Sequence, residues 1–444
     1  MPKKIRFFIE YFLHYLRTYS FVILLGIVSG SLIYAKRDFI IPAIINLSAK
    51  QNHIGIEGLY TNTHLPPQLS GLISHGLTVI SANDKPILSP IVDSVDTDET
   101  NLFYTFNFKE PLYWHNGRKF RSSDLSITIP GATITYPSPN SLTITLKSQY
   151  SPLMSLLSQP LYYNQSLIGV GDYQVVKTTY QDGFIKTLEI VAIKNKQDRT
   201  TYHFYPNSTD LINAFKLGEV NQLTTSILGD SHQWRNVKIN PSVSTRQYLA
   251  IFLNTSKLSS KTFRQSLAYA TPKTSDKNQR CLGPISPISW AYNPQIKPYN
   301  YNPTRAKELM DKDEVKQINL MITDRQLLST AEIIKKSWQD ILGIQVNLSI
   351  ENQKPDLINY EAILSYGTIP NDPDQYPFWH STQTATNITH FNNSRIDKLL
   401  EEGRLNSNPV ERKQIYQDFQ RYLLEESPVI FLEFPTSYNI SRVK

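Results

Sequence analysis

A strand, an amphipathic helix and a second strand are predicted to follow one another between residues 317 and 350. Ile318, Leu320 and Ile322 alternate with other residues, which is the pattern of a strand with one buried face. Apolar residues then recur at helical spacing before Gly343, a residue that suits a helix end: Leu327, Leu328, Ala331, Ile334, Trp338, Ile341 and Leu342. Alternation resumes over residues 344–350. Two strands joined by a helix pair in parallel through a right-handed crossover, so this segment predicts an α/β fold.

The other regular elements are predicted on both sides of this unit. Strand-like runs with turns dominate residues 54–255, the clearest being 102–108, 141–146 and 187–193, with a helix over 209–217 closed by Gly218. Asn408 and Pro409 start a helix that ends near Glu426, and a strand follows over 429–432. The chain has 444 residues, and single cores stop growing at about 250–300 residues. We therefore expect at least two lobes, and a chain that returns to its first lobe at the carboxyl end would form a hinged cleft.

Residues 19–35 are 17 in number and carry no charge. Four basic residues precede them, with only Glu10 opposing: Lys3, Lys4, Arg6 and Arg17. A run of this length can span a membrane, and its basic flank predicts a cytoplasmic amino terminus. The alternative is a cleaved signal peptide, but the bulky, basic exit over residues 33–37 favours an uncleaved anchor. We expect a cytoplasmic segment at 1–18, a single-pass anchor in the cell membrane at 19–35, and a stalk at 36–52.

Several functional classes lack support in the sequence. The formal charge of +7 is modest, and no run interleaves basic and aromatic residues as a nucleic-acid site would. Cys281 is the single cysteine, which excludes an internal disulfide and a zinc site built from cysteines. Zinc-protease, nucleophile-elbow and P-loop motifs are absent. The acidic turn 371–374 lacks the further ligands of a calcium loop. We therefore predict no catalytic site, metal or cofactor, and an exported hydrolase stays a remote alternative.

Two loops rich in aromatic and polar residues are candidates for binding a ligand. The first, GPISPISWAY over residues 283–292, contains Trp290 and Tyr292. The second covers residues 366–380 and contains four further candidates: Tyr366, Asp372, Asp374 and Trp379. Loops of this composition can line a cleft for a polar, partly apolar ligand. The alternative is that the aromatic rings only cover the core.

A series of short motifs, in order and spacing, resembles family 5 of the extracellular solute-binding proteins. The first half of the chain supplies Leu65-Pro66, Gly76-Leu77-Thr78, Tyr104 with Phe106, Trp114-His115-Asn116-Gly117, Gly169-Val170-Gly171-Asp172-Tyr173 and the segment 214–219. The second half supplies FRQSLAYA over residues 263–270, Gly283-Pro284-Ile285 with Trp290, Tyr301-Asn302-Pro303, and the loop from Asp372 to Ser381. The resemblance covers about residues 60–435, which is nearly all of the expected exported part.

The resemblance implies a two-lobed, hinged α/β clamp of the type II periplasmic-binding-protein kind, with an extra small subdomain. The first lobe would cover 53–255, with a trimmed subdomain because the stretch between Asp124 and Gly169 is short, and the second lobe would cover 256–430, with 431–444 returning to the first. The chain would be the monomeric, extracellular peptide-binding component of an ABC importer and would contact its permease. A peptide sensor that works without a transporter is the alternative.

The resemblance also implies roles for single residues. Tyr366 falls where peptide-binding members carry a pocket tryptophan, and Asn254 falls on an asparagine that would bond the ligand backbone. Ile369 falls where those members carry an aspartate that pairs with the α-ammonium of the peptide. Asp372 or Asp374 would have to take over that contact, or the amine is not bound there.

Overall fold

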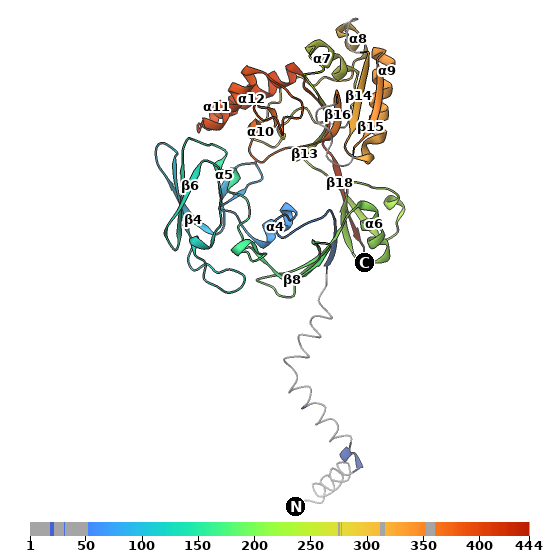
Figure 1. The fold of residues 1–444 in the computed structure, drawn as a ribbon. Coiled ribbons are helices and arrows are strands. Elements are labelled where there is room, and N and C mark those ends of the chain that lie inside the picture. Colours follow the sequence, from blue (N-terminus) through green and yellow to red (C-terminus); the bar gives the residue numbers. More distant parts are fainter. Residues whose placement is uncertain are drawn as a thin grey trace, which may run out of the picture.

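The computed structural model describes residues 18–21, 31, 52–273, 276, 278–310, 316–351 and 360–443. Over these residues no helix has both the length and the apolar character needed to cross a membrane. The predicted anchor at 19–35 lies almost wholly outside the described residues, as do the cytoplasmic segment and the stalk. The described chain forms two lobes, one above the other in Figure 1.

The first lobe is built on a mixed seven-stranded sheet in the order β12-β18-β11-β1-β10-β9-β8. Its strands are β12 (Val237–Val243), β18 (Thr436–Arg442), β11 (Gln222–Thr225), β1 (Asn52–Glu57), β10 (Arg199–Tyr205), β9 (Phe184–Ala192) and β8 (Tyr173–Gln181). The helices α4 (Pro67–Ile73) and α6 (Ser208–Leu217) pack against this sheet.

A smaller four-stranded antiparallel sheet, in the order β4-β5-β7-β6, extends the first lobe and has its own apolar core. Its strands are β4 (Val92–Thr97), β5 (Phe103–Phe108), β7 (Ser141–Leu146) and β6 (Ala132–Ser138). The short helix α5 (Leu153–Leu156) and the hairpin of β2 (Thr78–Ile80) and β3 (Pro86–Leu88) complete it. We call this part the small subdomain.

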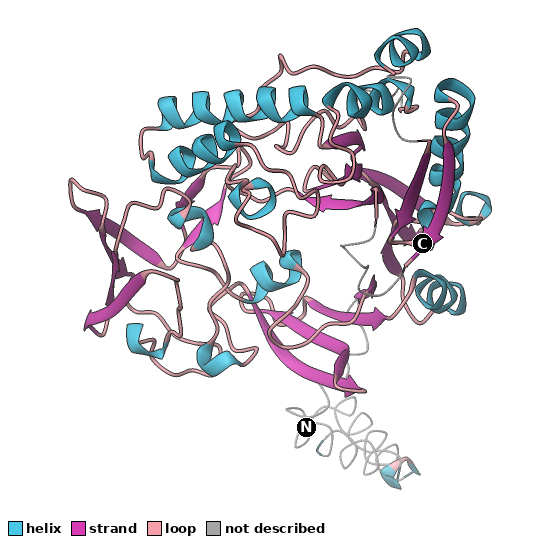
Figure 2. Ribbon diagram, turned by 45° about the horizontal axis from the view of Figure 1, so that its top comes forward, coloured by secondary structure: helices cyan, strands magenta, loops and turns pink. Residues whose placement is uncertain are grey.

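The second lobe is a five-stranded sheet in the order β15-β14-β16-β13-β17, with helices on both faces. Its strands are β15 (Gln345–Ile350), β14 (Gln317–Ile322), β16 (Ala362–Thr368), β13 (Gln247–Leu253) and β17 (Val429–Glu433). Its helices are α7 (Lys261–Ala270), α8 (Pro303–Leu309), α9 (Leu328–Leu342), α10 (Tyr376–Trp379), α11 (Ser394–Leu405) and α12 (Pro409–Glu426). Figure 2 shows that most of the helices of the described chain lie in this lobe.

The predicted strand–helix–strand unit is confirmed. β14 and β15 pair in parallel, with Gln317 opposite Gln345, and α9 joins them. The helix buries one stripe against the sheet because its apolar residues recur every three or four positions: Ala331, Ile334, Trp338 and Leu342 are buried. Gly343 ends α9 with φ of 67°, a conformation that glycine adopts without a Cβ clash.

The predicted start of α12 is also confirmed. The side chain of Asn408 accepts a hydrogen bond from the amide of Val410 at 3.0 Å, and Pro409 is the first helical residue. The strands predicted at 102–108 and 141–146 correspond to β5 and β7, and the one at 187–193 overlaps β9.

Two chain crossings connect the lobes. The chain leaves β12 in the first lobe and enters β13 in the second, and it returns from β17 to β18. In the crossings, the amide of Ser244 donates to the carbonyl of Pro435 at 2.9 Å. β18 then lies between β11 and β12, so the end of the described chain is built into the first lobe (Figure 1).

Candidate functional site

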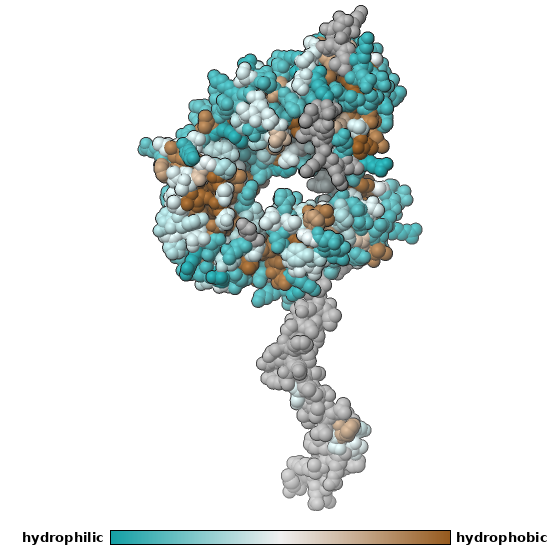
Figure 3. All heavy atoms as spheres, viewed as in Figure 1, coloured by the Kyte–Doolittle hydropathy of each residue, from teal (hydrophilic) through white to brown (hydrophobic). Residues whose placement is uncertain are grey.

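The molecule is hollowed between its two lobes (Figure 3). On one side the hollow is closed by the two crossings. On the other side, α5 and the segment before it approach α11 of the second lobe (Figure 1). There the amide of Ser151 donates to the carbonyl of Arg404 at 2.8 Å, and Ser151 Oγ donates to the carbonyl of Asn406 at 2.5 Å. We call these contacts the α5–α11 bridge.

An ion pair adds a further contact between the lobes beside the crossings. Arg246, just before β13, pairs with Asp84 in the turn of the β2–β3 hairpin. The side chain of Asp84 is 2% exposed, whereas that of Arg246 is 35% exposed. The first lobe, the second lobe, the crossings and the α5–α11 bridge together surround the hollow.

Two predicted ligand-binding residues, Tyr366 and Trp379, line one pocket of the second lobe. Its volume is about 180 Å³. The other lining residues are apolar, aromatic or hydroxyl-bearing: Tyr248, Phe252, Gly367, Thr368, Phe378, Thr386, Ile388 and Thr389. Trp379 is buried and its indole N–H donates to Gln375 Oε1 at 3.2 Å, while Tyr366 is 40% exposed. We call this the aromatic pocket.

The aromatic pocket depends on a glycine. A Cβ at Gly367 would lie 2.3 Å from Cζ of Tyr248, on the neighbouring strand β13. Only a residue without a side chain therefore lets the Tyr248 ring lie across β16. Carbon atoms in contact are normally about 3.5–4.0 Å apart.

A carboxylate lies beside Tyr366 at the end of the sheet that faces the first lobe. Leu249 of β13 pairs with Tyr366 of β16 on one side and with Glu433 of β17 on the other. The register between β13 and β17 shifts at Leu249, so a β-bulge lies at this end of the sheet and Glu433 is next to it. Burial raises the pKa of Tyr366, and Asp324 and Glu433 raise it further. Burial also raises the pKa of Glu433.

Asp372 and Asp374 are both engaged by arginines inside the second lobe. Arg412 of α12 binds Asp372 with two hydrogen bonds, of 3.0 Å to Oδ2 and 2.5 Å to Oδ1. Arg404 of α11 donates its Nε to Asp374 Oδ2 at 2.9 Å and its Nη2 lies 2.9 Å from the same oxygen. Burial raises the pKa of Asp374, and Arg404 opposes that rise. Either carboxylate would have to leave its arginine to bind a ligand amine.

Trp290 lies in the same region as Asp372 but outside the aromatic pocket. The guanidinium of Arg412 is 5.5 Å from the centre of the Trp290 ring, and Trp290 meets Tyr416 edge-on at 6.5 Å. Tyr292 is half-buried, and its carbonyl accepts a hydrogen bond from Gln417 at 3.2 Å. Both loop residues therefore contact α12 from the 283–292 loop, and their binding roles stay predictions.

Asn254 lies at the other end of β13 from the hollow. It is 1% exposed, its Nδ2 donates to the carbonyl of Tyr360 at 3.1 Å, and its Oδ1 accepts from Ser256. Tyr366 pairs with Leu249, five residues earlier, so roughly 16 Å of strand separates the two. The structure does not bring Asn254 to Tyr366, and the proposed ligand contact of Asn254 stays a prediction that this geometry does not favour.

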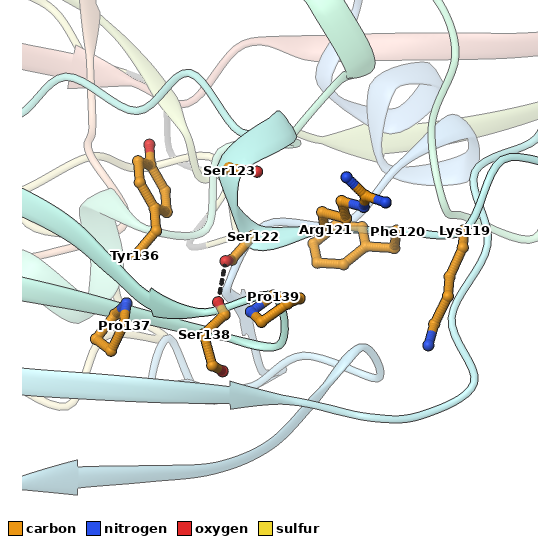
Figure 4. Close-up of a pocket in the computed structure, with 9 residues that line it drawn as sticks. All are labelled: Lys119, Phe120, Arg121, Ser122, Ser123, Tyr136, Pro137, Ser138 and Pro139. Atoms are coloured by element: carbon orange, nitrogen blue, oxygen red, sulfur yellow. Dashed lines mark hydrogen bonds between the residues drawn. The ribbon is translucent and has the colours of Figure 1, made fainter.

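Two further pockets belong to the first lobe. One of about 460 Å³ on the small subdomain is lined by residues from two stretches of chain: Lys119, Phe120, Arg121, Ser122, Ser123, Tyr136, Pro137, Ser138 and Pro139 (Figure 4). In it, Ser122 Oγ donates to the carbonyl of Ser138 at 2.7 Å. A pocket of about 590 Å³ lies between the loop at 113–117 and the strands β8 and β9. Among the residues that the structure describes, no group of three His, Cys, Asp or Glu could hold a metal ion.

Glu433 was not among the residues predicted from the sequence. It lies in an apolar strand, and nothing in that run marks its carboxylate as functional. Its place beside Tyr366 depends on pairing between three strands that are far apart in the chain, which local patterns do not reveal. The single cysteine, Cys281, is buried, and burial raises the pKa of its thiol to about 12.

Comparison with known proteins identifies the family. Residues 126–389, more than half of the chain, match the family described as "Bacterial extracellular solute-binding proteins, family 5 Middle". The chain belongs to family 5 of the bacterial extracellular solute-binding proteins. This confirms the family predicted from the motifs. Members of this family are located outside the cytoplasm and bind solutes.

Relatives and solved structures agree with this assignment. The chain is 23% identical over 280 residues to the oligopeptide-binding protein AppA of Bacillus subtilis, covering 54% of this chain and 51% of AppA. The chain thus spans about half the length of that curated relative. The crystal structure of NikZ from Campylobacter jejuni in complex with Ni(L-His) superposes with a TM-score of 0.71 at 21% identity, covering 89% of this chain and 94% of that one. The structure of AppA in complex with a nonapeptide gives a TM-score of 0.67 at 16% identity, covering 88% and 94%. At these identities the likeness shows the fold, which is the two-lobed, mixed α/β fold of periplasmic binding proteins.

Proposed function

We propose that this protein is the extracellular substrate-binding component of an ABC importer and that it takes a peptide or a similar solute between its lobes. The observation that carries the proposal is the aromatic pocket, which opens beside Tyr366 in the lobe that is joined to the first by only two crossings. Hinge closure around a ligand is a common motion of proteins with this architecture. AppA, which shares the fold, is named for binding oligopeptides and has been solved with a nonapeptide. The chain binds without catalysing a reaction, and it acts as a monomer.

The aromatic pocket suits an apolar side chain of the solute. Its lining is formed by aromatic rings, aliphatic groups and hydroxyls, without a charged residue. A solute side chain that enters it loses contact with water without leaving a charge unpaired. Main-chain groups of the peptide would remain in the wet hollow, where water can bridge them to both lobes.

Glu433 is the carboxylate best placed to attract a positive charge of the solute. Its charge raises the pKa of Tyr366, and burial has already raised its own pKa, so a nearby ammonium would stabilise its charged form. Asp372 and Asp374 are held by arginines and serve the packing of the lobe.

The solute class is tested by thermal unfolding of the purified chain. A ligand that binds only the folded state adds about 2.7 kcal/mol of stability at a hundredfold excess over its dissociation constant. We expect a pool of short peptides to raise the melting temperature and sugars or nucleotides to leave it unchanged. Tyr366→Ala should reduce the peptide effect, and Tyr301→Ala, a change of an exposed tyrosine of the same lobe, should not. A sugar effect without a peptide effect would overturn the peptide assignment.

The role of Glu433 is tested by calorimetry with one peptide in free and N-acetylated forms. We expect acetylation to weaken binding to the native chain and to have little effect on Glu433→Gln. If N-acetylation weakens binding equally in both proteins, a group other than Glu433 binds the amine of the peptide.

The anchor is tested by fractionation. We propose that residues 19–35 hold the chain in the cell membrane, with the amino terminus in the cytoplasm and the lobes outside. The chain should stay in the membrane fraction after an alkaline carbonate wash. A soluble form that begins near residue 36 would show a cleaved signal instead. The alternative function, a transporter-independent peptide sensor, would be favoured if no permease and ATPase genes accompany this one.

A further inference from the structure

The pocket of about 590 Å³ on the first lobe exposes apolar side chains in one hollow. Three of the residues that line it are half exposed: Tyr113 at 54%, Val176 at 47% and Ile193 at 46%. They come from three separate segments, which are the loop at 113–117, β8 and the residues just after β9. We call this pocket the apolar groove. Exposed apolar side chains that gather in one place are typical of a surface that another element covers.

The apolar groove lies at the end of the sheet where β1 begins. β1 runs parallel to β10, and its first residue, Asn52, is paired with Thr200. Arg199, the residue before Thr200, lines the groove and is paired with Val191 of β9, which also lines it. Neighbouring strands are about 4.8 Å apart, so Val191 lies roughly 10 Å from the start of β1. The chain therefore enters the first lobe beside the groove.

The residues that precede β1 in the sequence include a strongly apolar run. Residues 39–45 read FIIPAII and contain four isoleucines and a phenylalanine. They lie outside the described residues. The run is too short to cross a membrane, and Lys36, Arg37 and Asp38 separate it from the predicted anchor at 19–35. In the exported part of the chain these side chains would be exposed to water unless they pack on an apolar surface.

The apolar run is tethered within reach of the groove. Residues 46–51 lie between Ile45 and the start of β1, and six residues of extended chain span about 20 Å. This is about twice the distance from the start of β1 to Val191. The charged residues of the groove are Lys196 and Arg199, and Arg199 is already paired with Glu189. An uncharged, apolar occupant therefore suits this lining.

We propose that residues 39–45 of the same chain dock in the apolar groove of the first lobe. The side chains of the run cover Tyr113, Val176 and Ile193, and the run in turn is shielded from water. The groove is separate from the aromatic pocket, with which it shares no lining residue. The docking therefore does not depend on which solute the protein takes.

Docking would shorten the tether between the membrane and the first lobe. Together with the proposed anchor at 19–35, a free tether would comprise residues 36–51, which can extend over about 50 Å. With residues 39–45 docked, residues 36–38 alone remain between the anchor and the lobe, and they span about 10 Å. The first lobe would then be held close to the membrane while the second lobe moves relative to it.

The test places a photoreactive benzoylphenylalanine at position 41 of the full-length chain in lipid vesicles. After illumination, the cross-linked product is identified by its size on a denaturing gel and by mass spectrometry of its peptides. We expect a cross-link within one molecule to peptides that contain residues 113–117, 170–176 or 191–199. Cross-linking to lipid, to a second copy of the chain or to another part of the same chain would overturn the proposal, as would the lack of any cross-link.

Charge substitutions locate the contact. Ile193→Asp places a carboxylate in the groove and should remove most of the cross-link, and Val176→Asp on β8 should do the same. Ile87→Asp is the matched control, because Ile87 of β3 is 52% exposed in the same lobe but does not line the groove. It should leave the cross-link unchanged. All three positions are about half exposed, and circular dichroism checks that each variant is folded. A cross-link that survives in both groove variants, or that is lost equally in Ile87→Asp, would overturn the proposal.

Discussion

The ion pair between Arg412 and Asp372 offers a direct test of whether Asp372 serves the fold or the ligand. Both side chains are almost fully buried, with 7% and 10% of their surface exposed. Arg412 makes two hydrogen bonds to the carboxylate, and its Nε donates to the carbonyl of Gly403 at 2.8 Å. Arg412→Met leaves a buried carboxylate without its partner, and such losses cost about 3–5 kcal/mol.

A double-mutant cycle separates the pair from its surroundings. Asp372→Asn removes the negative charge, and the double variant Asp372→Asn/Arg412→Met removes both charges. We expect the double variant to be less destabilised than the sum of the single variants by about 1.5 kcal/mol or more, because neither charge is then left alone. Arg421→Met is the matched control on the same helix. Arg421 is 51% exposed and 2.9 Å from Asp418, so its loss should cost about 0.5 kcal/mol or less.

Stability is measured by urea unfolding followed by tryptophan fluorescence, which reports on the packing of Trp290 near this pair. Peptide affinity is measured on the same variants by calorimetry. A loss of less than about 1 kcal/mol in Arg412→Met would refute the structural role. Asp372→Asn with unchanged stability and abolished peptide binding would establish Asp372 as a ligand contact instead.

Three further predictions concern the lobes and the hollow between them. Arg246→Gln leaves the buried carboxylate of Asp84 without its partner across the lobes, so the melting temperature should fall by about 4 °C or more and X-ray scattering should show a larger radius of gyration. The raised pKa of Glu433 means that its ionisation costs stability once the pH exceeds the unfolded value near 4.3. Glu433→Gln should therefore raise the melting temperature at pH 7 by about 2 °C, and this gain should shrink as the pH falls towards about 4. Gly367→Ala places a Cβ 2.3 Å from Tyr248 and should cost about 1–3 kcal/mol in urea unfolding, whereas Gly71→Ala, where a Cβ meets nothing within 4 Å, should be neutral or stabilising.

The sequence predicts regular elements of this protein well where the pattern is local. The spacing of Ile334, Trp338 and Leu342 defines the buried face of α9 without reference to the rest of the chain. Asn408 predicts the start of α12 because an N-cap side chain bonds to amides only two or three residues away. The order of the lobes and the family follow from motifs whose spacing is itself a sequence property.

The candidate site is harder to predict from the sequence because its residues are brought together by contacts between segments that are far apart in the chain. Asp372 and Asp374 lie in a polar loop, and from the sequence of that loop their carboxylates would be expected to be free. Their partners Arg412 and Arg404 lie 40 and 30 positions further on, on helices whose orientation no local pattern gives. Asn254 matches its family position in the sequence, yet its side chain is taken up by internal hydrogen bonds. The position of Glu433 near Tyr366 follows only from the pairing of β17, β13 and β16 in the folded sheet.

The contacts that surround the hollow set how easily a solute can enter and leave. The α5–α11 bridge includes two hydrogen bonds of Ser151, and a typical intramolecular hydrogen bond contributes about 1 kcal/mol. Asn101, Tyr150 and Ser155 of the small subdomain also contact the second lobe there. Loss of the two Ser151 hydrogen bonds alone would cost about 2 kcal/mol, which corresponds to roughly a thirtyfold change in the equilibrium between the closed and the open ring. A solute at a hundredfold excess over its dissociation constant contributes about 2.7 kcal/mol. A solute that contacts both lobes therefore contributes at least as much to the closed ring as these two hydrogen bonds.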